Sequence, residues 1–431
     1  MDSVSERGRN TLNLMSFMNV QAAQVLPDIY NEQKNPKGFI NLGIAENCTC
    51  EEVICTKVQE CLTFNPATQY YYPFGGKLNF RNALADFLSE RLAKGMELDP
   101  KKIVVTSGVG AAFDMMAHMF AEREDCFLVL APFYSAIEYD VFLRSGVKLH
   151  HIHRPVHDTN KLRAFSFDEE LLEQGYQEAI DLGHKVKAII VINPGNPTGM
   201  IHTRLELLTA SKFAQRHDIH IIYDEIYALS VFGDDAEFIS ALSMPELLTN
   251  DKSHFMWGFS KDFGISGIRC GMVYTNSAEY LKGANKLSYF GGVPSVIQDA
   301  LARMISDKAW LDDVYFPTNL QRLRENHDVM EKGLTSLGII CHPVKAGFFI
   351  YANFSKYMKE QTTAEELKLF NEFKAAKVYL IPGTGLKSKE VGWFRVTFTN
   401  KQEAVARGDF TQIRILGSRL DRIEAVLKQR S

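Results

Sequence analysis

Residues 254–271 place a lysine and an arginine where both could act on one ligand. The apolar run 254–257 predicts a strand, and Lys261 follows it, before a turn that contains glycines. A lysine at the end of a buried strand is costly unless something occupies its amine, and an imine with an aldehyde cofactor would make it a covalent catalyst. Arg269, eight positions further on, could then bind a phosphate group of the same ligand. A surface lysine beside an ordinary turn is the alternative.

Polar residues also follow other predicted strands. Asn196 lies in a rigid Pro- and Gly-containing turn after the apolar run 188–192, and Asp224 and Tyr227 follow the run 219–223. Ligands of open parallel α/β sheets bind at the carboxyl ends of the strands, so these side chains are candidates for one site. The small-residue turn 107–110 precedes a predicted helix, and the free backbone N–H groups of such a helix start suit an anion.

The surrounding pattern predicts an α/β protein. Short apolar runs alternate with helical patterns from about residue 102 to 275, which is typical of a mostly parallel sheet flanked by helices. The following elements are expected after residue 300: a long helical stretch at 310–337, further helices at 363–376 and 413–428, and strands at 348–351, 378–381 and 393–398. We predict an N-terminal arm with part of the small domain at 1–45, a large cofactor-binding domain at 46–300, and a small C-terminal domain at 301–431.

Composition excludes several classes of function. The 431-residue chain is 46% hydrophobic, and its 48 Lys and Arg against 52 Asp and Glu give a net charge of −4. No basic excess indicates a nucleic-acid or anionic-lipid partner. The first residues lack the apolar run of a signal peptide, and no run of about 18 apolar residues indicates a membrane span. We therefore expect a cytoplasmic protein with no nucleic-acid and no membrane partner.

The cysteine and histidine spacings do not predict a metal site or a disulfide framework. Seven cysteines are an odd number, and Cys48, Cys50, Cys55 and Cys61 lack the paired C-x-x-C spacing of a zinc site. We expect free, mostly buried thiols. The histidines at 150–153 alternate with apolar residues, so we interpret them as strand side chains.

Five motifs occur in the order found in one enzyme family. They are Gly-Ile-Ala-Glu-Asn at 43–47, Asn-Pro-Gly-Asn-Pro-Thr-Gly at 193–199, Tyr-Asp-Glu-Ile-Tyr at 223–227, Ser-Lys-Asp-Phe-Gly at 260–264 with its downstream arginine, and Gly-Trp-Phe-Arg-Val at 392–396. Residues 40–400 thereby resemble the fold-type I pyridoxal-phosphate enzymes, most of all the 1-aminocyclopropane-1-carboxylate synthase-like branch of the aminotransferases. The resemblance implies pyridoxal 5'-phosphate as cofactor and a homodimer with shared active sites.

The resemblance also implies roles for residues around the cofactor. Lys261 would hold the cofactor as an imine and then move the substrate Cα proton. Asp224 would pair with the protonated pyridine nitrogen, and Tyr227 and Asn196 would bind the phenolic oxygen. Tyr134 would stack on the ring.

Further family positions concern the phosphate and the substrate. Val109 and Gly110 would offer backbone N–H groups to the phosphate, and Ser260 could compensate for Gly258, where the family often has serine. A hydroxyl residue is also common where this chain has Gly110. Arg395 matches the arginine that binds the substrate α-carboxylate. Glu46 matches an acid near the substrate's amino end or the cofactor face.

Phe74 is the departure with the largest consequence. It lies in the aromatic run 70–76, which we expect to form a loop that reaches the partner's site. Authentic synthases have tyrosine at the position aligned with Phe74, and losing its hydrogen bond would leave a partner unpaired at a cost of roughly 1–3 kcal/mol. Tyr72 could take that role if the loop shifts. Ring-forming synthase activity is therefore in doubt.

We therefore expect a pyridoxal-phosphate enzyme that exchanges its imine with a small L-amino acid and then removes the Cα proton. Aminotransferase or eliminating lyase activity is the main hypothesis. Authentic 1-aminocyclopropane-1-carboxylate synthase acting on S-adenosylmethionine is the first alternative. A non-catalytic regulatory or binding protein built on the same fold is an alternative of another class. A Rossmann-type dehydrogenase is less favoured because no G-x-G-x-x-G follows the early strands.

Overall fold

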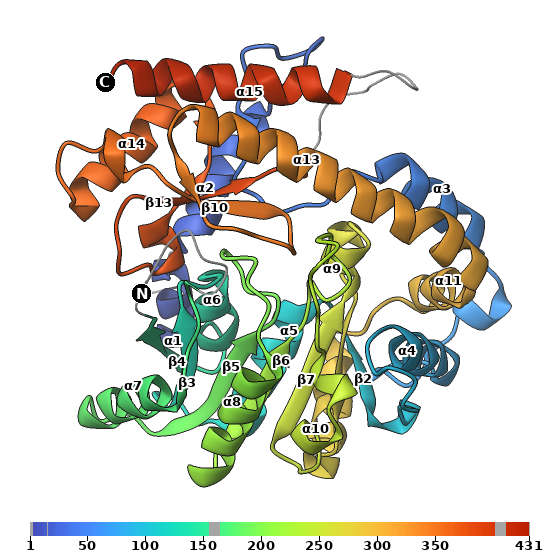
Figure 1. Ribbon diagram of the computed structural model, residues 1–431. Coiled ribbons are helices and arrows are strands. Elements are labelled where there is room, and N and C mark those ends of the chain that lie inside the picture. The colour runs from blue at the N-terminus through green and yellow to red at the C-terminus, as the bar shows by residue number, and fades with distance from the viewer. Residues whose placement is uncertain (1–2, 15, 155–163, 401–410, 431) are drawn as a thin grey trace.

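The computed structural model describes residues 3–14, 16–154, 164–400 and 411–430. A seven-stranded sheet forms its centre (Figure 1). Its strand order is β2 (Ile103–Thr106), β8 (Gly271–Thr275), β7 (Ser253–Gly258), β6 (His220–Asp224), β5 (Val186–Ile192), β3 (Cys126–Ala131) and β4 (Lys148–His153). Strand β8 is antiparallel to both of its neighbours, whereas the other pairs are parallel. The carboxyl ends of the parallel strands therefore meet at one edge.

Helices cover both faces of this sheet, and the alternation along β3 shows why. Phe127 and Val129 pack in a buried cluster with α5 (Val109–Phe120) and α10 (Ala278–Leu287). Leu128 and Leu130 point to the opposite face and pack with α7 (Glu169–Asp181) and α8 (Arg204–Arg216). A strand buried on both faces must be apolar at every position, which accounts for the continuous apolar runs in the sequence.

A third buried cluster lies at the β2 end of the sheet. It joins side chains of α3 (Glu51–Cys61), α4 (Leu78–Arg91) and α11 (Ser295–Ser306) to β7 and β8. The aromatic run at 70–76 connects α3 to α4 as a loop with a short 3-10 turn before it (Pro66–Thr68).

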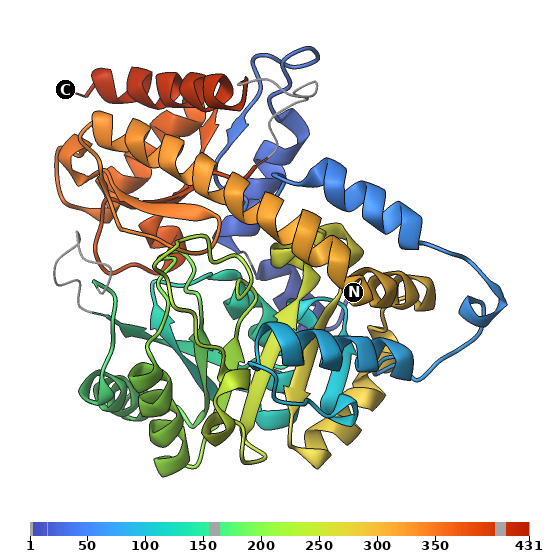
Figure 2. The same cartoon turned by 45° about the vertical axis from the view of Figure 1, so that its right-hand side comes forward.

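A smaller α/β unit lies above the large sheet (Figures 1 and 2). Its sheet has the order β12 (Ile381–Pro382), β13 (Trp393–Thr397), β10 (Phe349–Asn353) and β9 (Ile340–Cys341). Helices α13 (Phe316–Ser336), α14 (Thr363–Ala375) and α15 (Thr411–Lys428) pack around it, and α13 extends toward α11. Met18 and Val25 of α2 (Phe17–Val25) belong to the same buried core. The N-terminal segment thus packs with the smaller unit, while the predicted domain boundaries stay a prediction.

Two expected elements differ in the structure. The prediction of one strand at 378–381 is wrong, because two short strands of different sheets occupy this segment. Val378–Tyr379 (β11) pairs with β1 (Ile40–Asn41), whereas β12 pairs with β13. The long helix expected at 310–337 is interrupted by a π-turn over Leu311–Tyr315, between α12 (Lys308–Trp310) and α13. Pro317 lies in the first turn of α13, and its missing N–H cannot donate the bond that an unbroken α-helix needs there.

The remaining short α-helices of the described residues are α1 (Glu6–Asn13), α6 (Ala136–Phe142) and α9 (Phe259–Asp262). All seven cysteines are free thiols, and five of them are buried. Within the described ranges no group of three or more His, Cys, Asp or Glu side chains is arranged to hold a metal ion. No helix in the described part of the chain has both the length and the apolar character that a membrane crossing requires.

Candidate active site

The turn after β7 carries Lys261, and a buried aspartate holds this turn in place. Asp262 is fully buried and accepts hydrogen bonds from Ser230 Oγ at 2.6 Å, Trp257 Nε1 at 2.8 Å and the Leu229 backbone N–H at 3.0 Å. Burial raises the pKa of Asp262 to about 7 despite these donors. The sequence analysis did not single out Asp262. The signal that could have revealed it is an acidic residue directly after the lysine, in a segment bounded by Phe259 and Phe263.

The Lys261 amine faces the segment that follows β1. Its Nζ donates to the Ala45 carbonyl at 2.5 Å. Burial, and next the nearby guanidinium of Arg395, lower the pKa of the amine to about 8, whereas Glu46 and Asp224 act in the opposite direction. A lysine with this pKa is partly neutral near neutral pH, which a nucleophile or a base must be.

This pKa predicts how the reactivity of Lys261 depends on pH. Only the neutral amine attacks an aldehyde, so the rate of reductive modification by pyridoxal and borohydride should rise with pH and level off above about 8. Lysines with the ordinary pKa of about 10.4 should keep gaining reactivity over that range. Peptide mass spectrometry of pulse-labelled protein would measure both, and a Lys261 profile like that of the other lysines would contradict the prediction.

Arg395 is a buried cation that pairs with no carboxylate among the residues that the structure describes. It lies on β13, its side chain is 0% exposed, and Nη1 donates to Asn196 Oδ1 at 2.9 Å. Nη2 donates to the Gly43 carbonyl, whereas Nε has no hydrogen-bond partner among the described residues. A buried guanidinium that binds only neutral oxygens can still accept an anionic ligand. Gly43 and Ala45 lie two residues apart, so one short segment contacts both Arg395 and Lys261.

The end of β6 supplies the second group of predicted residues. Asp224 is buried, and burial, reinforced by Asp140, raises the pKa of its carboxyl to about 7 while the Ile226 N–H opposes the shift. The Tyr227 hydroxyl lies 3.5 Å from Asn196 Nδ2, and both side chains are buried. The structure therefore brings together Asp224, Asn196, Tyr227, Lys261 and Arg395 at the carboxyl edge of the sheet.

The start of α5 has the predicted anion-binding geometry. Val109 and Gly110 are its first two residues, after Gly108 at φ 82°. Arg269 donates from Nη1 to the Ser266 carbonyl at 3.0 Å and from Nη2 to the Ser107 carbonyl at 3.5 Å. A Cβ on Gly108 would lie 2.6 Å from the Arg269 guanidinium, so glycine is what lets this cation approach the helix start.

Asp140 is a charged neighbour that the sequence did not reveal. It lies on α6, and a Cβ added to Gly110 would sit 3.1 Å from its carboxylate oxygen. Burial, and then the charge of Asp114, raise the pKa of Asp140 to about 6. The family often has a hydroxyl residue at the position of Gly110. In this chain the glycine has no side chain that would crowd the Asp140 carboxyl group. No local motif marks Asp140, because it reaches α5 only through the fold.

Three further predicted residues flank this group. Tyr134 directly precedes the turn into α6, and its side chain is 38% exposed. Glu46 is half-buried, and its Oε1 accepts from Ser266 Oγ at 3.0 Å. Ser260 is partly buried and precedes Lys261 on α9.

Phe74 lies in a separate aromatic group. Its ring contacts Tyr71, Tyr72 and Tyr289, the last at 5.1 Å between ring centroids. The Tyr72 hydroxyl donates to the Val293 carbonyl of its own chain, so here it is not free for the role suggested for it. The ring contacts of Phe74 in the described part of the chain are thus with tyrosines of this group, not with the residues around Lys261 and Arg395.

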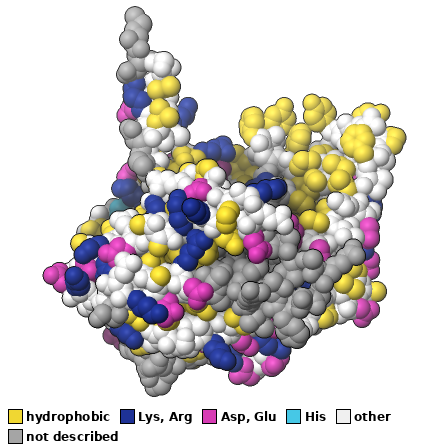
Figure 3. Space-filling view, turned by 90° about the horizontal axis from the view of Figure 1, so that it is seen from above, with side chains coloured by type: hydrophobic (Ala, Val, Ile, Leu, Met, Phe, Trp, Pro, Cys, Tyr) yellow, Lys and Arg dark blue, Asp and Glu magenta, His cyan; other side chains and the backbone are white. Residues whose placement is uncertain are grey.

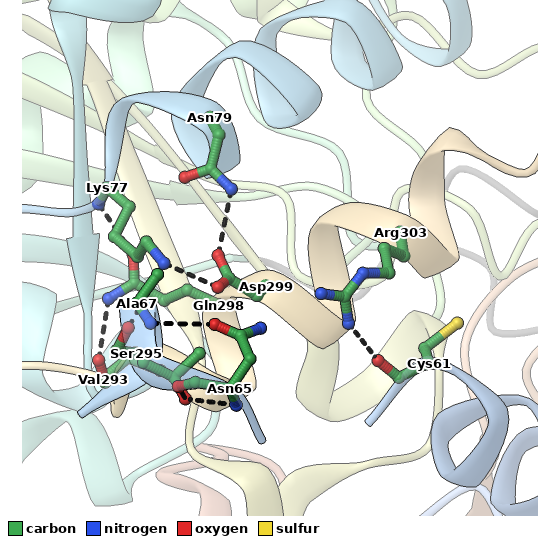
Figure 4. Close-up of polar contacts among 11 residues, drawn as sticks. Cys61, Asn65, Ala67, Lys77, Asn79, Val293, Ser295, Gln298, Asp299 and Arg303 are labelled. Atoms are coloured by element: carbon green, nitrogen blue, oxygen red, sulfur yellow. Dashed lines mark hydrogen bonds and ion pairs between the residues drawn. The ribbon is translucent and has the colours of Figure 1, made fainter. Parts of the chain in front are cut away.

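Figure 4 shows how the start of α4, which directly follows this aromatic loop, is attached to α11. Lys77, at the start of α4, donates through its backbone N–H to Gln298 Oε1 at 2.8 Å and through Nζ to Asp299 at 2.6 Å. Asn79 also donates to Asp299, at 2.9 Å. Gln298 donates in turn to the Val293 carbonyl at 2.7 Å, which is the carbonyl that the Tyr72 hydroxyl contacts. The loop and the segment after α10 are therefore held as one unit.

Gly264 shows how closely the lysine turn meets the Glu46 segment. It has φ 65°, and a Cβ would lie 2.3 Å from the Asn47 carbonyl oxygen. We expect Gly264→Ala to lower the free energy of unfolding by about 2–4 kcal/mol, because the residue is strained and clashes with backbone. Gly267→Ala is the matched control, since a Cβ there meets nothing within 4 Å. Urea unfolding measures both, and equal midpoints would contradict the prediction.

The strand order, the smaller α/β unit and the site at the carboxyl edge define a fold-type I aminotransferase architecture. An aromatic aminotransferase from Pyrococcus horikoshii OT3 has a similar structure, with a TM-score of 0.75 and 25% sequence identity over 91% of this chain and 96% of that chain. Residues 37–407 match the family model for aminotransferase class I and II, and the chain belongs to that family.

Curated relatives agree with the resemblance seen in the motifs. The 1-aminocyclopropane-1-carboxylate synthase-like protein 1 of Bos taurus is 36% identical over 384 residues, which cover 88% of this chain and 76% of that protein. The probable inactive 1-aminocyclopropane-1-carboxylate synthase-like protein 2 of Homo sapiens is 35% identical over 389 residues, which cover 90% of this chain and 68% of that protein. The predicted fold class and family are thus confirmed.

Proposed function

We propose that this protein is a pyridoxal-phosphate enzyme that acts on a small L-amino acid, as an aminotransferase or an eliminating lyase. The observation that carries the proposal is the pairing of Lys261 with Arg395. One is an amine whose pKa is lowered to about 8. The other is a buried guanidinium whose Nε has no partner within the described ranges, and the segment 43–45 contacts both. An amino acid offers a carboxylate for the guanidinium and a Cα proton beside the amine.

The residues present fit the family's usual cofactor. The start of α5 and Arg269 suit a phosphate, and the buried Asp224 carboxyl suits a ring nitrogen that carries a proton. Asn196 and Tyr227 would hydrogen-bond the phenolic oxygen, and Tyr134 would cover the ring. When bound, the cofactor would supply an aldehyde electrophile and an electron sink.

The chain's own groups would then orient the substrate and move its proton. Arg395 would bind the carboxylate in two places and so fix the Cα–H bond relative to Lys261. Lys261 Nζ would take the Cα proton, and Asp224 would keep the ring nitrogen protonated. Glu46 would face the amino end of the substrate.

Phe74 favours transamination or elimination over ring closure. Phenylalanine keeps the ring but lacks the hydroxyl that the synthases place at this position. One relative is described as probably inactive. A non-catalytic protein built on the same fold is therefore the second outcome that the product analysis must distinguish.

We also infer a cytoplasmic homodimer with shared active sites. Figure 3 shows hydrophobic side chains gathered over one part of the face seen from above. Large aromatic side chains are exposed in and beside the aromatic loop, and such a group is more than a monomer usually leaves in water. They are Phe64, Tyr70, Tyr71, Tyr289 and Phe290.

Product analysis by mass spectrometry tests the reaction. Purified protein with added cofactor would be incubated with S-adenosylmethionine, vinylglycine, cystine, or an amino-acid pool with 2-oxoglutarate. New glutamate would support transamination, and keto acid with ammonia but no glutamate would support elimination. A cyclopropane amino acid would contradict the argument from Phe74, and the absence of any visible cofactor absorbance would contradict the proposal itself.

A further inference from the structure

Ser266 contacts two parts of the candidate site that are far apart in the sequence. Its Oγ donates to Glu46 Oε1 at 3.0 Å, and its carbonyl accepts from Arg269 Nη1 at 3.0 Å. Ser266 begins the 3-10 turn Ser266–Ile268, directly before Arg269. The residue therefore meets the carboxylate near Lys261 with its side chain and the guanidinium near α5 with its backbone.

The main chain around Glu46 is already fixed. The Glu46 carbonyl accepts from Thr399 Oγ1 at 2.6 Å, and the Cys48 N–H donates to the Thr399 carbonyl at 3.0 Å. The neighbouring Ala45 carbonyl accepts from Lys261. What stays adjustable is the Glu46 side chain, which is half-buried and has several rotatable bonds. The Ser266 hydroxyl restricts it.

The direction of this carboxylate matters for the lysine. Burial and the guanidinium groups of Arg395 and Arg269 lower the pKa of the Lys261 amine, and Glu46 and Asp224 oppose them. Glu46 differs from the other groups that act on this pKa in how its charge is held. Its carboxylate accepts a hydrogen bond from one hydroxyl, that of Ser266, which belongs to a distant segment of the chain. A rotation of Glu46 toward solvent would remove a negative charge from the amine and from the substrate's ammonium group.

We propose that Ser266 is a positioning residue that holds the Glu46 carboxylate toward Lys261 and the amino group of the substrate. This inference rests on the proposed function, because it assigns Glu46 a substrate to contact. A hydrogen bond to a charged group is worth enough to hold the side chain in one direction against its rotamer entropy.

A set of variants in the cofactor-loaded enzyme tests the role. Ser266→Ala should raise the KM for the amino acid about tenfold with a smaller effect on kcat, and should shift the midpoint of the pH titration of the visible absorbance. Ser266→Thr keeps a hydroxyl and should behave much more like the original protein. Gly267→Ala changes the same turn without removing a hydrogen bond, so its KM should equal that of the original protein.

The decisive comparison uses Glu46→Gln as a background. If Ser266 acts through Glu46, adding Ser266→Ala to Glu46→Gln should change KM far less than it does in the original protein. Equal effects in both backgrounds, or an unchanged KM for Ser266→Ala, would overturn the positioning role while leaving the proposed function intact. An original protein that acquires no visible absorbance with the cofactor would overturn both.

Discussion

Lys261→Ala should reduce the exchange of the substrate Cα proton by about 10²–10⁴-fold and remove the visible absorbance expected of a cofactor bound through this lysine. The first effect follows from losing the base, since a positioned acid or base contributes typically 10²–10⁴-fold. The second follows from losing the amine that is proposed to bond to the cofactor. Proton NMR in deuterium oxide measures the exchange, and a scan of the loaded protein measures the absorbance.

Lys252→Ala is the matched control for this change. Lys252 lies directly before the opposite end of β7, and its Nζ pairs with the Asp218 carboxylate at 2.5 Å. An exposed pair of this kind contributes little to stability, so the variant should exchange the Cα proton at the original rate. An active Lys261→Ala protein, or an inactive Lys252→Ala protein, would contradict the assignment of Lys261.

The positions of the candidate site residues could be predicted because they follow from strand direction. Asp224 ends β6 and Lys261 follows β7, and these two strands are parallel neighbours in the sheet. Their carboxyl ends must therefore be adjacent. The motif that contains Asn196 follows β5, which is the parallel neighbour of β6 on its other side. The alternation of strands and helices along the chain therefore also predicted the position of Asn196.

Contacts between distant segments could not be predicted in this way. Asp140 reaches Gly110 only because α6 packs beside α5, and Ser266 meets Glu46 across 220 positions of sequence. No local pattern encodes either pair. The division of 378–381 between two sheets has the same origin, because its strand partners β1 and β13 lie far apart in the chain. Periodicity reports which residues are buried, but it does not report which segment buries them.

The selectivity for an amino acid over the corresponding amine should depend on Arg395. Arg395→Leu removes the cation that would bind the carboxylate, so we expect kcat/KM for the amino acid to fall about 10²–10³-fold. The decarboxylated amine cannot use that cation, and its reaction should change much less. The ratio of the two kcat/KM values therefore isolates carboxylate binding from any general damage to the site.

Arg154 provides the control for the loss of a buried guanidinium. It is 8% exposed and donates to the carbonyls of Ala131, Pro132 and Phe165, so Arg154→Leu also leaves buried acceptors unpaired. Both variants should lower the urea midpoint, but only Arg395→Leu should lower the ratio of amino acid to amine turnover. If Arg395→Leu keeps the original ratio, or if Arg154→Leu lowers it equally, the carboxylate is not bound by Arg395.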